Sequence, residues 1–219
     1  MYYQFLIEDQ STTILVETIM ERIHSKNPDI TFKCNSFKGS GTYIKRKTAK
    51  ETKTGKLLND LSAILPGISK SLRGFPAVIM VVLDNDTRNT EDFRSVLNGI
   101  AEEHMIDTDY VFCIAVEEME AWLLGDEAAI LAAYPSAKLQ PLRKYKQDSI
   151  CGTWEVLADV VYPGGAAKLK RDSPTYYEIG KQKIEWAQNI GAYMHLEQNK
   201  SPSFNYFITE VNKRLLAAD

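Results

Sequence analysis

The sequence has few of the residues on which thiol and metal-thiolate proteins depend, with three cysteines among 219 residues. Cys34, Cys113 and Cys151 are far apart, and no C-x-x-C spacing is present. Such spacing is the usual sign of a metal site built on cysteine, so none is expected. We interpret the three residues as reduced, structural thiols of a cytoplasmic protein.

The chain also lacks long apolar stretches. No apolar run reaches the roughly 18 residues of a membrane helix, so no membrane association is expected. The first residues do not combine a basic segment with an apolar one, so no secretory signal is expected. The net charge is −3, and nucleic-acid binding would therefore need a local basic patch. A P-loop is excluded because no G-x-x-x-x-G-K-[ST] motif occurs.

What the sequence does contain is an alternation of strand and helix patterns in its first part. Four apolar or alternating segments, each bounded by polar residues, are predicted as strands. They cover residues 2–7, 30–37, 77–83 and 110–116. Helical periodicity lies between and after them. This order predicts an α/β fold with a mostly parallel sheet of about four strands and helices on both faces.

Helix boundaries are predicted from capping residues and breakers. Ser11 or Thr12 is expected to cap the first helix, and Asn89 or Thr90 a later one. A helix starting at Leu57 is expected to end at Pro66-Gly67. Residues 117–124 are expected to be helical.

Beyond about Asp126 the strand patterns fade. Helices are expected over residues 127–134, 153–161 and 177–188, and after a cap at Ser201 with Pro202 at the first helical position. We therefore predict an α/β domain over residues 1–126 and a helical extension over residues 127–219 that packs on it.

Acidic residues follow two of the predicted strands. Glu8 comes directly after the first strand, and Asp84 and Asp86 follow the most apolar one. In an open parallel sheet the carboxyl ends of the strands line the ligand crevice, so these side chains converge if the strands are neighbours. Clustered carboxylates are commonly joined by a hard cation such as Mg²⁺. The alternatives are ordinary turn chemistry for Asp84 and Asp86, and an exposed loop acid for Glu8.

A further acidic group, Glu117-Glu118-Met119-Glu120, follows the fourth predicted strand. Glu117 and Glu120 are three positions apart and share one helical face. We predict Glu117 as a metal ligand and Glu120, with Glu8, as a catalytic residue. The alternative is that these acids only complement the dipole of a helix N-terminus.

One basic segment could bind a nucleic-acid backbone. The alternative is a solvated loop, which is the more common fate of a charge run. The segment contains Lys45, Arg46, Lys47, Lys50, Lys53 and Lys56.

The arrangement of Glu after the first strand and Asp-x-Asp after a later one resembles the Toprim fold. More closely, the chain resembles a mostly bacterial Toprim-like family catalogued as domain of unknown function four-two-seven-six. The most specific matches are the segment Glu-Ala-Trp-Leu-Leu-Gly-Asp over residues 120–126 and Ser-Pro-Ser-Phe over residues 201–204. The resemblance implies a Mg²⁺ site on Glu8, Asp84 and Asp86 and a distant relation to overcoming-lysogenization-defect nucleases. Toprim domains usually have glycine after the glutamate, whereas this chain has Asp9.

These observations favour a Mg²⁺- or Mn²⁺-dependent nuclease or related phosphodiester-processing protein. The resemblance also implies a partner ATPase in a genome-defence system. One alternative is a catalytically silent subunit that binds such an ATPase. Another is a small phosphoesterase that acts on a nucleotide.

Overall fold

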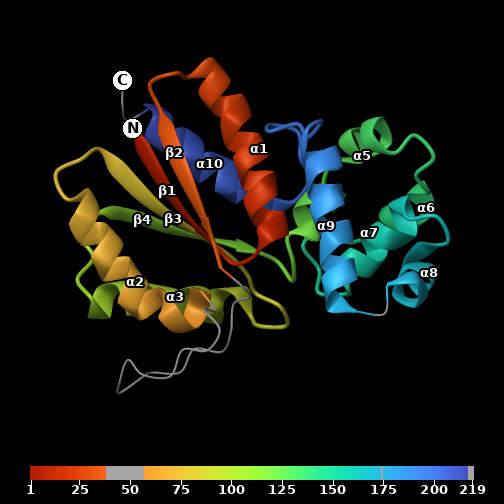
Figure 1. Ribbon diagram of the computed structural model, residues 1–219, viewed down its shortest axis with the longest axis horizontal. Coiled ribbons are helices and arrows are strands. Elements are labelled where there is room, and N and C mark those ends of the chain that lie inside the picture. The colour runs from red at the N-terminus through yellow and green to blue at the C-terminus, as the bar shows by residue number, and fades with distance from the viewer. Residues whose placement is uncertain (38–56, 174, 217–219) are drawn as a thin grey trace.

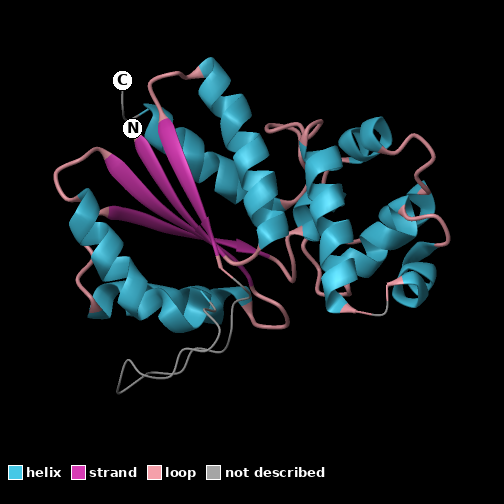
Figure 2. Cartoon of the chain, in the orientation of Figure 1, coloured by secondary structure: helices cyan, strands magenta, loops and turns pink. Residues whose placement is uncertain are grey.

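The computed structural model describes residues 1–37, 57–173 and 175–216, and within them the chain forms one four-stranded sheet flanked by helices (Figures 1 and 2). All strand pairs are parallel, and the strand order is β2-β1-β3-β4. The predicted α/β class is thus confirmed, with the four strands close to their expected positions. These are β1 (Tyr2–Ile7), β2 (Thr31–Ser36), β3 (Ala77–Asp84) and β4 (Asp109–Ala115).

Helices cover both faces of the sheet. On one side lie α1 (Gln10–Lys26) and α10 (Pro202–Leu216), and on the other lie α2 (Leu57–Leu72) and α3 (Thr90–Glu103) (Figure 1). Strand β3 contributes side chains to the hydrophobic cores on both faces of the sheet, because successive side chains of a strand point to opposite faces. Val78, Met80 and Val82 belong to the core beneath α1 and α10, whereas Ile79 and Val81 belong to the core beneath α2 and α3. Burial on both faces explains the continuous apolar run of β3.

Helix α2 continues past the proline at which the sequence predicted its end. Pro66 lies inside the helix, which runs on to Leu72, so the predicted end at Pro66-Gly67 is wrong. Proline removes one intrahelical hydrogen bond, but tertiary contacts hold the last turns in place. Ser69 is buried, and its hydroxyl donates to Asp107 at 2.9 Å.

Six further helices of the described residues lie mainly to one side of the sheet (Figure 1). Two of them, α6 and α8, were not predicted, and α4 begins three residues later than expected. They are α4 (Glu120–Leu124), α5 (Glu127–Ala133), α6 (Leu139–Lys144), α7 (Thr153–Val161), α8 (Gly165–Asp172) and α9 (Tyr176–Gly191). In the described parts of the chain, every helix is too short or too polar to cross a bilayer.

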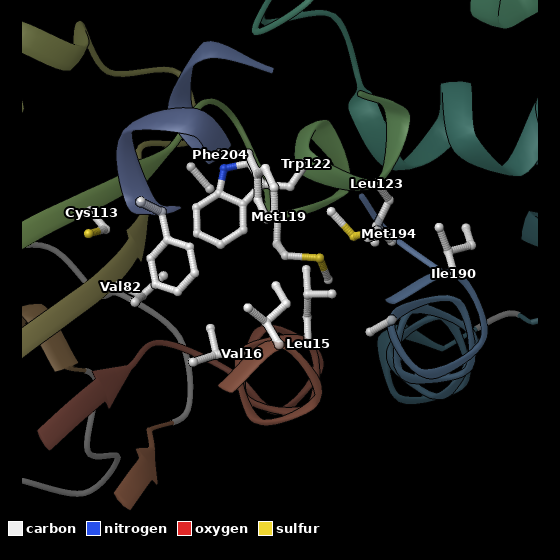
Figure 3. Packing of buried hydrophobic residues seen from close by; sticks show 14 of the residues in the cluster. Leu15, Val16, Val82, Cys113, Met119, Trp122, Leu123, Ile190, Met194 and Phe204 are labelled. Atoms are coloured by element: carbon white, nitrogen blue, oxygen red, sulfur yellow. The ribbon is translucent and has the colours of Figure 1, made fainter. Parts of the chain in front are cut away.

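A buried aromatic group connects α4 with the C-terminal helix (Figure 3). The Trp122 ring stacks on Phe207 at a centroid distance of 5.1 Å and meets Phe204 edge-on at 5.6 Å. Its indole N–H donates to the Ser203 hydroxyl at 2.9 Å. Because Phe207 also contacts Phe5 of β1, helix α10 lies on the sheet although it belongs to the predicted extension. The division at residue 126 stays a prediction.

Candidate functional site at the carboxyl edge of the sheet

Strands β1 and β3 are neighbours, and their carboxyl ends bring two acids together. Ile7 pairs with Val82, and the backbone N–H of Glu8 donates to the Val82 carbonyl at 3.1 Å. The Asp84 backbone N–H in turn donates to Glu8 Oε2 at 2.9 Å. Both acids are buried, with 7% of Glu8 and 9% of Asp84 exposed. Glu8 therefore holds the backbone at the point where β3 ends.

A cavity of about 440 Å³ opens at this edge, between the start of α1 and helix α9. Its lining includes three acids, Asp9, Asp84 and Glu120. Helix α9 contributes two lysines, Lys181 and Lys183, together with apolar and aromatic groups. Acids from the end of β3, the start of α1 and the start of α4 therefore line the same cleft as two lysines of α9. We call the part lined by Asp84 and Glu120 the floor of the cleft.

Lys183 forms ion pairs with two acids at this edge. Its ammonium lies 3.1 Å from Glu118 Oε2 and 3.3 Å from Glu120 Oε2, and 19% of its side chain is exposed. Burial alone would lower the pKa of Lys183, but the carboxylates of Glu120, Glu118 and Asp84 raise it above its ordinary value. The lysine thus carries a full positive charge across the physiological range.

The acids around Lys183 are harder to ionise than usual. Burial, followed by repulsion from Glu8, Asp9 and Glu120, raises the pKa of Asp84 well above its ordinary value. Burial also raises the pKa of Glu120, and that of Glu118 to about 7, although Lys183 opposes both shifts. The single positive charge of Lys183 cannot neutralise the ionised carboxylates of Asp84, Glu118 and Glu120, which are poorly solvated.

Two carboxylate oxygens on the floor have no hydrogen-bond partner. They are Asp84 Oδ1 and Glu120 Oε1, and both are buried. An unpaired buried oxygen of a charged group is costly, so such atoms call for a proton or a cation. Hard divalent cations bind carboxylate oxygens of this kind.

The carboxylate oxygens of Asp84 and Glu120 are of the type that binds Mg²⁺, but they do not form a complete coordination shell. Among the described residues, no group of three or more His, Cys, Asp or Glu side chains has the geometry to hold a metal ion. Mg²⁺ commonly keeps several waters and uses one or two carboxylates together with substrate phosphates. Asp84 and Glu120, each with one unpaired oxygen, match that smaller requirement.

Asp86 lies apart from this floor. Its carboxylate binds Arg88 at 2.8 Å, half of its side chain is exposed, and it is absent from the lining of the cleft. The intervening Asn85 is fully buried and accepts a hydrogen bond from the Glu117 backbone N–H at 2.5 Å. Asp86 has a positive φ of 50°, so the backbone turns sharply after β3. The structure thus places only the first acid of Asp-x-Asp in the cleft.

Glu117 binds backbone groups at the start of helix α7. Its carboxylate accepts N–H bonds from Cys151, Gly152 and Thr153 at 2.8–3.0 Å. The N-cap residue of α7 is Gly152, which has no side chain to satisfy these donors. Glu117 therefore anchors α7, and its assignment as a metal ligand stays a prediction.

Asp9 is the N-cap of α1, so the predicted cap at Ser11 or Thr12 is wrong. Its carboxylate accepts from the Thr12 backbone at 2.9 Å and from the hydroxyls of Ser11 and Thr12 at 2.6 and 2.8 Å. These contacts give Asp9 a structural role at the start of α1. Of the two predicted caps of α3, Asn89 and Thr90, the structure shows Asn89, and the predicted cap of α10 at Ser201 is confirmed.

Sequence reasoning missed Lys183, although one signal was present. Ile179, Trp186, Ala187 and Ile190 follow the spacing of one inward face of α9, and position 183 falls on that face. Trp186, Ala187 and Ile190 are buried. A lysine in an apolar stripe indicates a buried partner of opposite charge.

The predicted nucleic-acid-binding residues, Lys45, Arg46, Lys47, Lys50, Lys53 and Lys56, lie outside the described residues.

Comparison with known proteins gives one match. No curated protein and no solved structure matches the chain. A family model does match, over residues 7–212, and that range includes Glu8, Asp84, Glu120 and Lys183. The relation to Toprim proteins stays a prediction. Because the match covers nearly the whole chain, the protein belongs to the family described as a domain of unknown function (DUF4276).

Proposed function

We propose that the cleft is the active site of a Mg²⁺- or Mn²⁺-dependent phosphodiester-processing protein, with nucleic acid as its substrate class. The observation that carries the proposal is the pair of buried, unpartnered carboxylate oxygens of Asp84 and Glu120 on the floor of one cavity. Their place at the carboxyl edge of a parallel sheet supports it, because ligands of open α/β sheets bind there.

Asp84 and Glu120 would hold the ion, with Glu8 fixing the backbone of Asp84. A bound Mg²⁺ supplies Lewis-acid stabilisation of negative charge on a phosphoryl group and lowers the pKa of a bound water. Glu118, with its pKa raised to about 7, is suited to accept or donate a proton near neutral pH. The assignment of Glu8 and Glu120 as catalytic residues stays a prediction.

The test compares Asp84 with Asp86, because the sequence analysis predicted both as ligands of the same metal ion. Plasmid and single-stranded nucleic acid are incubated with wild-type protein, Asp84→Asn and Asp86→Asn in Mg²⁺ or Mn²⁺. We expect cleavage by the wild type and by Asp86→Asn, and loss of at least about a hundredfold in rate for Asp84→Asn. Equal cleavage by all three proteins would point to a contaminating nuclease and remove the proposal.

A second candidate is a catalytically silent subunit that binds a partner such as an ATPase. The observation that favours it is the ion pair of Lys183 with Glu118 and Glu120, which already supplies the floor with a cation. In that case the wild type would bind no Mn²⁺ at millimolar concentration, and Asp84→Asn would raise the stability by removing an uncompensated buried charge.

A further inference from the structure

We propose that Lys183 and a divalent ion compete for the same carboxylate, so that metal binds only when the ammonium leaves Glu120. This inference rests on the proposed function, and it concerns how the site is regulated. Lys183 then acts as a resident counter-ion that keeps the empty cleft stable and sets the metal concentration at which the cleft loads.

The geometry around Glu120 supports direct competition. Glu120 is 1% exposed, and its two oxygens differ in their surroundings. Oε2 binds the Lys183 ammonium at 3.3 Å, whereas Oε1 has no partner. A metal on Oε1 and an ammonium on Oε2 would be held a few ångströms apart across one carboxylate. Two cations so close in a buried place repel strongly.

In the part of the chain that the structure describes, no second cation forms an ion pair with Glu118 or Glu120. Among the ion pairs of the described residues, Lys183 provides the contacts of both Glu118 and Glu120. Lys181 also lines the cleft, but its ammonium lies over the Tyr177 ring, 4.6 Å from the centroid. Within the described residues, the balance of charge at Glu118 and Glu120 therefore depends on Lys183.

The lysine has room to move away. It has a long flexible stem, and its ion-pair partner Glu120 lines an open cavity. Gly180, one turn before Lys183 in α9, also lines the cavity, and a Cβ added there would meet nothing within 4 Å. The ammonium can thus swing from Glu120 toward the cleft without displacing the backbone.

The test compares Mn²⁺ affinity in Lys183→Met and Lys181→Met, measured by the electron paramagnetic resonance signal of free Mn²⁺. Methionine keeps most of the apolar stem and removes the charge. We expect Lys183→Met to bind Mn²⁺ at least about tenfold more tightly than the wild type, and Lys181→Met to stay within about twofold. Weaker or equal binding by Lys183→Met overturns the inference.

Lys183→Met leaves the carboxylates of Glu118 and Glu120 without their ion-pair partner, and this variant could fail to fold. A second variant therefore tests the same inference with less unpaired charge. Glu118→Gln combined with Lys183→Met removes one charge of each sign. We expect Mn²⁺ to raise the melting temperature of this double variant more than that of the wild type. An equal or smaller rise overturns the inference.

The two proposals fail in distinguishable ways. If the wild type binds Mn²⁺ and Asp84→Asn does not, but removing Lys183 fails to tighten binding, the metal site stands and the competition is refuted. If no variant binds Mn²⁺, the proposed function fails, and Lys183 is a permanent structural partner of the acids.

Discussion

Removing the carboxylate of Glu117 tests whether this residue supports the fold or binds metal. Three backbone N–H groups at the start of α7 donate to it at 2.8–3.0 Å. Hydrogen bonds to a charged group contribute about 1.5–3 kcal/mol each, and partial exposure here favours the low end. Since the donors share one carboxylate and regain water when it is removed, we expect Glu117→Ala to lower the free energy of unfolding by about 3 kcal/mol.

The assay is urea and thermal denaturation of the metal-free protein. For a chain of this size, about 3 kcal/mol corresponds to a fall in melting temperature of about 6–12 °C. Glu102→Ala, an exposed acid of α3, is the control and should change stability by less than about 0.5 kcal/mol. Mn²⁺ binding by Glu117→Ala should equal that of the wild type.

A glycine variant separates the carboxylate from the backbone. Glu117 has a positive φ of 64°, a region that glycine adopts without strain. Glu117→Gly should therefore be about 1 kcal/mol more stable than Glu117→Ala. A stable Glu117→Ala that no longer binds Mn²⁺ would refute this reasoning and restore the assignment of Glu117 as a metal ligand.

Three further outcomes follow from the structure. In EDTA, the free energy of unfolding should fall as the pH rises from 4.5 toward 7, because folding raises the pKa of Glu118 from its ordinary 4.5 to about 7. Urea titrations at several pH values measure this slope, and Glu118→Gln should reduce it. Gly125→Ala should lower stability by about 2–3 kcal/mol in the same assay, since the added Cβ would lie 1.9 Å from Asn199 Oδ1; an unchanged midpoint would show that this loop yields. Asp9→Ala should cost about 1 kcal/mol through loss of the α1 cap, and a neutral result would contradict the role given to Asp9.

The sheet could be predicted because its signals are local. The strand of residues 77–84 is apolar on both faces, and its burial on both faces is what a parallel sheet requires. At α3 the cap could be narrowed to Asn89 or Thr90, which directly precede an amphipathic segment, and Asn89 is the residue that caps the helix. At α1, several cap-forming residues stand close together, and propensity does not decide among Asp9, Ser11 and Thr12.

Only part of the candidate site could be predicted from the sequence. Acids at the ends of β1 and β3 follow from topology, because neighbouring parallel strands end at one edge. Lys183 lies 63 positions from Glu120 in the chain, and no local rule relates two residues so far apart. The separation of Asp84 from Asp86 depends on a positive φ that the turn imposes after the strand, which the spacing of the two acids does not reveal.

The most direct measurement is a crystal of the wild-type protein soaked in Mn²⁺ and examined by anomalous diffraction. We expect one peak in the cleft within coordination distance of Asp84 Oδ1 and Glu120 Oε1, with the Lys183 ammonium moved away from Glu120. A peak on Asp86 or Glu117, or no peak in the cleft at millimolar Mn²⁺, would contradict it.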